Sequence, residues 1–153
     1  MSALLAEPRT RMGSTAADLL TDASRAVDRA IHLLQTEGSR VARWRIVTQL
    51  IEARNAFSAH AEICRAGDGP LRHVTSIRPR LEPEVLETIR EHARVLDKLD
   101  GLVASLTAGV GDEANGVAVL SATLKVSSAL ITHQRHTTAI VFEWANRDIG
   151  GES

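Results

Sequence analysis

Apolar residues in the last third of the chain recur at alternating steps of four and three, which is the spacing of one face of an α-helix. This seam runs through residues 119–144 without a proline or a glycine. It consists of Val119, Thr123, Val126, Leu130, His133, Thr137, Ile140 and Trp144. The pattern predicts one long amphipathic helix that carries a histidine, His133, on its core face.

Two earlier stretches share the same anomaly, an apolar helical seam with one histidine in it. The first consists of Leu50, Ala53, Phe57, His60 and Cys64, and the second of Val85, Ile89, His92, Leu96, Leu99, Val103 and Leu106. Imidazole is a poor filler of an apolar core unless its two nitrogens find partners. Three seams with one histidine each therefore predict that His60, His92 and His133 meet inside the protein.

Glycine and proline residues divide the chain into four helical segments. The predicted helices cover residues 14–37, 40–65, 83–107 and 115–146, and the seam of the first is Leu20, Ala23, Val27, Ala30 and Leu34. Amphipathic helices of this length favour an all-α fold, namely an antiparallel up-down four-helix bundle. We expect the bundle to span residues 14–147, between flexible tails at 1–13 and 148–153.

In such a bundle the three histidines lie near one level. His60 is close to the end of its helix and His92 is close to the start of the next, so antiparallel packing brings both to the same end. His133 falls within a turn or two of that level. On the first helix the opposing level is residues 20–24, which contain no histidine.

The composition limits the classes of function. A chain of 153 residues, 44% of them hydrophobic, has room for one domain with a real core, and a net charge of -1 gives no reason to expect a nucleic-acid partner. Cys64 is the only cysteine, which excludes an internal disulfide and favours a cytoplasmic location. No window of about 18 uninterrupted apolar residues predicts a membrane span.

Candidate chemistry centres on the three histidines and the single thiol. His60 and Cys64 are four residues apart and project from one helix face, and His92 and His133 complete a set of three imidazoles and one thiol. Such a set suits a tetrahedral zinc ion or a mononuclear iron. The structural alternative is that Cys64 is a small core hydrophobe and that the histidines bond to one another, to Thr137 or to water.

The order of these residues resembles a known family. The pattern is His60 followed by Pro70, then Glu91 and His92 followed by Val95, Leu96, Leu99 and Leu102, then His133 followed by Phe142. Over about residues 16–145 this spacing is similar to that of the hemerythrin-like family, also described as HHE cation-binding domains. The resemblance implies a four-helix bundle that holds a non-haem di-iron centre among its helices.

The resemblance also implies roles for single residues. His60, His92 and His133 match ligand histidines of the family, whereas Cys64 and Thr137 stand where its bridging carboxylates should be. Ala23 or Ser24 occupies the place of its first-helix histidine. A di-iron pair needs carboxylates to bridge the metals and offset their charge. We therefore expect one iron or zinc ion, held by His60, Cys64, His92 and His133, rather than a standard di-iron centre.

The remaining charges near the seams are interpreted as solvated. By helical phase Glu62 and Glu91 point off the seam, Glu87, Glu91 and Glu143 lie on solvated helix faces, and His136 lies beside the seam. No G-x-S-x-G, P-loop, G-x-G-x-x-G or cysteine pair indicates an enzyme.

Three functions stay open. The first is a divergent hemerythrin-like protein that binds one metal ion and senses oxygen, nitric oxide or redox state. The second is a metal-free remnant that acts as a protein-interaction or regulatory module. The third is a bundle whose core holds a small molecule or a haem. The expected partners are therefore a metal ion or small ligand and, under the second function, another protein.

Overall fold

The computed structural model of this chain describes residues 12–38, 42–66, 70–108 and 116–150, and within these ranges it is almost entirely helical, with no β-strand. The elements are α2 (Met12–Glu37), α3 (Arg43–Arg65), α4 (Pro70–Ile77), the 3-10 turn η2 (Pro79–Leu81), α5 (Glu82–Ala108) and α6 (Gly116–Gly150). The prediction of an all-α fold is confirmed.

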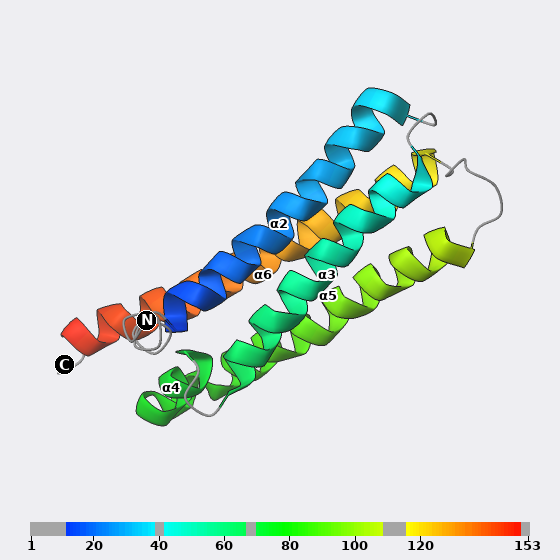
Figure 1. Cartoon of the computed structure of the whole chain (residues 1–153). Helices are drawn as coiled ribbons and strands as arrows, with labels where there is room; N and C mark the ends of the chain where they lie inside the picture. Colours follow the sequence, from blue (N-terminus) through cyan, green and yellow to red (C-terminus); the bar gives the residue numbers. More distant parts are fainter. Residues whose placement is uncertain (1–11, 39–41, 67–69, 109–115, 151–153) are drawn as a thin grey trace, which may run out of the picture.

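Four long helices, α2, α3, α5 and α6, lie side by side (Figure 1). α2 packs against α3 and α6, α5 also packs against α3 and α6, and the short α4 lies at the end of the molecule where α3 ends and α5 begins. Between α3 and α5 the regular structure consists of α4 and η2. Pro79 opens η2, and Pro83 lies in the first turn of α5, where the missing backbone N–H of proline breaks no helical hydrogen bond.

Two groups of buried apolar side chains fill the space among the helices. The main apolar cluster consists of Leu20, Ala23, Ala26, Val27, Ala30, Leu34, Ile46, Leu50, Ala53, Phe57, Val95, Leu99, Leu102, Leu106, Val119, Val126 and Leu130. The end cluster, on the α4 side, consists of Ala16, Cys64, Leu71, Val74, Leu81, Val85 and Ile140. On α3, α5 and α6 the histidine of each helix falls between members of the two clusters.

The seam of α5 differs from the predicted one on one flank. Its buried residues are Val85, Thr88, His92, Val95, Leu99, Leu102 and Leu106, whereas Ile89, Leu96 and Val103 are half-buried. On α3, similarly, Ile46 is buried and Val47 is half-buried. Each helix touches two neighbours, so its apolar stripe is wide, and the positions of the neighbours decide which flank lies deeper.

The helix ends also differ from the predicted boundaries. α2 begins at Met12, ahead of the expected start at residue 14, and α6 continues to Gly150, so that residues 148–150, assigned to a tail, are helical. The rest of both predicted tails, 1–11 and 151–153, lies outside the described residues. So do residues 109–115, between α5 and α6.

One segment of α6, Gly116–Glu143, is long and apolar enough to cross a membrane by length and composition, and most of its apolar window is not buried within the molecule. The same test is passed by core helices of proteins that do not enter membranes. The expectations of no membrane span and of a cytoplasmic location therefore stay predictions.

Candidate metal centre

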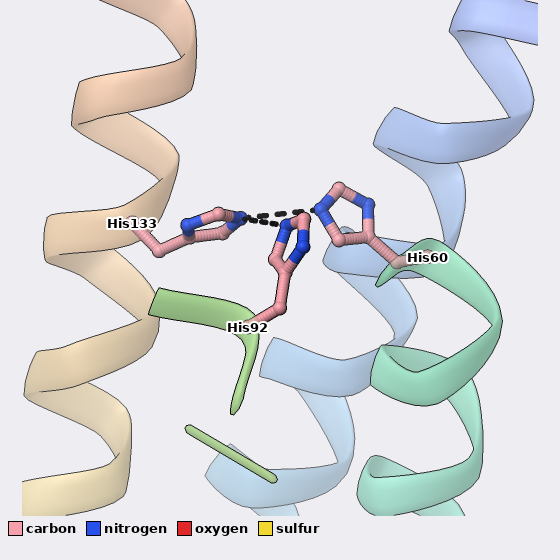
Figure 2. A group of neighbouring side chains, drawn as sticks. All are labelled: His60, His92 and His133. Carbon is pink, nitrogen blue, oxygen red and sulfur yellow. Dashed lines mark hydrogen bonds between the residues drawn. The ribbon is translucent and has the colours of Figure 1, made fainter. Parts of the chain in front are cut away.

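The three seam histidines converge at one point, as predicted. His60 of α3, His92 of α5 and His133 of α6 turn their rings toward one another (Figure 2). The Nε2 atom of His133 lies 3.2 Å from Nε2 of His60 and 3.1 Å from Nε2 of His92. One ligand atom from each residue lies within 4.8 Å of the other two, an arrangement that could hold a metal ion. We call these residues the histidine layer.

The histidine layer is closed to solvent. The exposed fractions of His60, His92 and His133 are 2%, 3% and 1%. On the side of the main apolar cluster, Phe57 packs against all three rings, with centroid distances of 5.5, 5.7 and 5.6 Å. Phe57 lies nearly one helical turn before His60, so a single α3 face supplies both the imidazole and the aromatic cover.

The outer nitrogen of His60 is fixed by the backbone of α2. Its Nδ1 lies 2.7 Å from the carbonyl oxygen of Ala16, in a buried contact. A carbonyl oxygen can only accept, so His60 Nδ1–H donates this hydrogen bond. In neutral His60 the Nε2 atom, which faces the other two histidines, therefore carries a lone pair.

The outer nitrogen of His133 is fixed in the same way by a carboxylate. Its Nδ1 lies 2.9 Å from Glu91 Oε1, and the other oxygen, Oε2, lies 2.5 Å from Nδ1 of His136. Glu91 is mostly buried, with a side chain only 12% exposed. An ionised carboxylate only accepts, so His133 also donates from Nδ1 and turns a lone pair inward. Hydrogen bonds from the outer nitrogen of histidine to carbonyls and carboxylates are the usual second shell of a metal site.

His60 and His133 thus direct lone pairs toward the same point, where they repel unless a proton or a cation lies between them. Metal-nitrogen bonds of about 2.0–2.1 Å at tetrahedral angles place ligand nitrogens about 3.3 Å apart. The observed separations of 3.2 and 3.1 Å are close to that value. The residues present therefore fit a metal ion bound by three imidazoles.

Burial favours the neutral forms that a metal requires. The pKa of His60 is lowered to about 4, mainly by desolvation. The hydrogen bond to Ala16 raises this pKa, and the neighbouring His133 lowers it. Desolvation and the neighbouring histidines lower the pKa of His92 to about 3. The pKa of His133 is also lowered by desolvation, although Glu91 opposes this change. At neutral pH all three imidazoles are uncharged and can act as ligands without losing a proton.

Cys64 stands apart from the three ligand atoms. Its Sγ lies 3.7 Å from His60 Nε2, and within the described residues the group that could hold a metal contains the histidines alone. Burial raises the pKa of the Cys64 thiol to about 11, so the thiolate form that binds metals is disfavoured at neutral pH. The sulfur of Cys64 is adjacent to the three histidines but outside the group that could hold a metal. The prediction that Cys64 is a fourth ligand stays a prediction.

A metal-free hydrogen-bond scheme is also available. Cys64 S–H can donate to His60 Nε2, and His92 Nε2–H can donate to His133 Nε2. His92 Nδ1 is a buried nitrogen without a hydrogen-bond partner, which costs about 1–3 kcal/mol. This cost applies whether His92 Nε2 bonds to His133 or to a metal ion, so it does not decide between the two schemes.

Sequence reasoning missed the outer part of the site. Glu91 was expected on a solvated face and His136 beside the seam, but the two are bonded to each other and Glu91 is bonded to His133. Their spacing offered a signal, because Glu91 adjoins His92 and His136 lies one helical turn from His133. Glu91 and His136 come together because α5 packs against α6, and this packing cannot be predicted from the sequence of either helix alone.

Other expected positions contribute nothing to the layer. Ala23 is buried in the main apolar cluster, and the first helix meets the layer through the Ala16 carbonyl, earlier than the predicted level at residues 20–24. Thr137 donates its hydroxyl to the carbonyl of His133, 3.0 Å away, as helix threonines commonly do. His32 is exposed, and the side chain of His73 lies outside the described residues.

No protein-family model, curated protein or solved structure matches this chain. The hemerythrin-like resemblance therefore stays a prediction.

Proposed function

We propose that this protein binds one divalent metal ion, zinc or iron, on His60, His92 and His133 in the core of a hemerythrin-like antiparallel four-helix bundle. The observation that carries the proposal is the pair of inward lone pairs. Ala16 and Glu91 hold His60 and His133 in the tautomer that a metal ligand needs, with 3.2 Å between their Nε2 atoms. A buried imidazole pair of this kind has no purely structural advantage over two leucines.

Zinc is the first choice among divalent ions. Three imidazoles without a carboxylate make a common zinc site, whereas non-haem iron is usually held by two histidines and one carboxylate. Glu91, the carboxylate hydrogen-bonded to the layer, faces the outer nitrogen of His133, and within the described residues the group that could hold a metal contains no carboxylate. A di-iron centre is not proposed, because nothing in the layer could bridge two ions.

The bound ion would supply a Lewis-acidic centre with coordination left for water or a small ligand. The chain itself orients the three imidazoles and excludes bulk water through Phe57 and the two apolar clusters. Since the rings are almost fully buried, a large organic substrate has no direct access to them. We therefore propose a role in binding the metal or in sensing oxygen, nitric oxide or redox state, rather than turnover of an organic substrate.

Elemental analysis of protein purified without chelator tests the proposal. We expect about one equivalent of zinc or iron, because the layer offers ligands for a single ion. His92→Ala and His133→Ala should lose the metal, while His32→Ala, which alters an exposed histidine of α2, should retain it. Metal-free wild-type protein after incubation with zinc and buffer exchange would contradict the proposal.

A second candidate, a protein-interaction or regulatory module without a metal, is favoured by one feature of α6. Val117, Leu124 and Ile131 are exposed apolar side chains at intervals of seven residues. Such a stripe is typical of a helix that packs against a partner. This function would be favoured if chelated protein sediments as an oligomer, if Leu124→Lys with Ile131→Lys makes it monomeric, and if zinc does not bind.

A further inference from the structure

The three outer nitrogens of the histidine layer lead to different surroundings. His60 Nδ1 ends on the main-chain carbonyl of Ala16, and His92 Nδ1 is buried without a hydrogen-bond partner. His133 Nδ1 alone is continued by side chains, through Glu91 to His136, whose own side chain is 51% exposed. Within the described residues, this bonded series is therefore the connection between the layer and an exposed ligand-type side chain.

The exposed end of the series opens into a groove. His136 lines a space of about 380 Å³ between α5 and α6, together with Pro83, Glu84, Glu87, Thr88, Ala139, Ile140 and Glu143. Apart from His136, the charged side chains in this lining are those of Glu84, Glu87 and Glu143. Two of the carboxylates face arginines nearby: Glu87 is paired with Arg90 and Arg94, and Glu143 lies 3.8 Å from Arg80.

The other groove beside Glu91 has the opposite character. It occupies about 340 Å³ between the same two helices and is lined by Arg94, Lys98 and Lys125, with Glu91 as its single carboxylate. A divalent cation is repelled by the three cationic side chains of this lining, whereas the lining around His136 contains three glutamates and no arginine or lysine, and arginines outside it offset part of the charge of two of these glutamates. Access for a cation is therefore favoured from the His136 side.

We propose that Glu91 and His136 form the route along which a divalent cation passes between this groove and the three buried histidines. The inference rests on the proposed metal site. Imidazole and carboxylate are both ligand types that zinc and iron accept, so the ion exchanges one protein ligand for the next along the series. In this proposal the His133 ring is the part that moves when the ion enters or leaves. Its outer nitrogen is held by a side chain, whereas the outer nitrogen of His60 is held by the backbone of α2.

The test measures rates as well as affinity. Metal-free full-length protein is mixed with Co²⁺ in a stopped-flow instrument, and the visible absorption of the bound ion is followed; release is followed after addition of excess chelator. His136→Ala is compared with wild type and with His32→Ala, which removes an exposed histidine far from the groove lining. Glu91→Gln is the second variant.

We expect His136→Ala to slow association and dissociation by a similar factor of about ten, equivalent to about 1.4 kcal/mol in the barrier. The dissociation constant should change by less than about twofold, because His136 is not a ligand in the final site. Glu91→Gln should slow loading as well, and it should also weaken binding, since Glu91 orients His133. His32→Ala should match wild type in every measurement.

Two results would overturn the route alone. One is wild-type loading and release rates in His136→Ala; the other is weaker binding caused by faster release at an unchanged association rate, which would make His136 a stabilising residue. Failure of wild-type protein to bind Co²⁺ at all would be a different outcome, because it would overturn the proposed metal site and the route with it.

Discussion

The histidine layer and the main apolar cluster next to it share the helices α3, α5 and α6 and are equally buried, but the side chains of the two regions respond differently to acid and to metal ions. Leu99 and Phe57 are fully buried, and their side chains carry no group that can be protonated or can bind a metal. His60, His92 and His133 are as deeply buried and can take up either a proton or a cation. Burial of apolar side chains is enough to stabilise the cluster. The contribution of the layer to the stability of the fold depends in addition on whether a proton or a metal ion binds to the inward-facing nitrogens.

Acid should separate the two regions most strongly. The unfolded histidines titrate near a pKa of 6.5, whereas folding lowers the pKa of His60 to about 4 and that of His92 to about 3. Between these values the unfolded state binds more protons, so the free energy of unfolding falls as the pH falls, by up to about 1.4 kcal/mol per pH unit for each histidine. Above pH 6.5 these groups contribute no pH dependence.

We therefore expect metal-free protein to unfold between about pH 6 and pH 4, since the combined loss approaches the stability of a typical domain. Far-UV circular dichroism in the presence of chelator measures the transition. A variant with His92→Leu should unfold at lower pH, and His32→Ala should not change the midpoint. A flat stability down to pH 4 would mean that the layer is not buried and neutral.

A charge placed in the apolar cluster should cost several kcal/mol. Leu99→Asp places a carboxylate among the apolar side chains of the main apolar cluster, where Leu99 is 0% exposed, and we expect it to lower the free energy of unfolding by about 4 kcal/mol or to prevent folding. Ala104→Asp, at an exposed position of the same helix, is the matched control and should change stability by less than about 0.5 kcal/mol. Urea denaturation measures both; equal stabilities would show that the buried face of α5 is wrongly assigned.

Helical periodicity is local, which explains how much of this fold the sequence revealed. It was enough to put His60, His92 and His133 on core faces, and the breaks in the sequence near Ala66 and Pro83 were enough to predict that the histidines lie near one level. The deeper flank of α5, Val95 rather than Leu96, depends on where its neighbours lie.

Two hydrogen-bonded contacts of the site could not be assigned from the sequence. The acceptor for His60 is the main-chain carbonyl of Ala16, and every residue has such a carbonyl. The pairing of Glu91 with His136 joins two helices across a contact that neither segment encodes alone. Composition and spacing could therefore predict the imidazoles but not what holds them.

Replacing a histidine of the layer by leucine should have a smaller effect, whose size depends on the residue. His92→Leu removes a buried Nδ1 that has no partner, but it also removes the Nε2–H that donates to His133, so the two effects offset and the stability of chelated protein should change by less than about 1 kcal/mol, while its response to zinc is lost. His133→Leu instead leaves Glu91 Oε1 without its donor, so the same measurement should show a loss of about 1–3 kcal/mol. A clearly larger loss for His133→Leu than for His92→Leu would support the assigned hydrogen bonds, and two losses of equal size would contradict them.

The smallest expected effect is the number of protons released when the metal ion binds, which decides whether Cys64 is a ligand. At pH 7 the three histidines are already neutral, so metal binding to them alone releases no proton. The thiol has a pKa raised to about 11, so a Cys64 ligand would have to lose a proton when the ion binds. Titration calorimetry with zinc in two buffers of different ionisation enthalpy measures this number directly. We expect a number of released protons and an affinity that Cys64→Ala changes little. Release of about one proton that Cys64→Ala abolishes would instead make the thiolate a fourth ligand; a water molecule on the ion can also release a proton, but Cys64→Ala would not abolish that release.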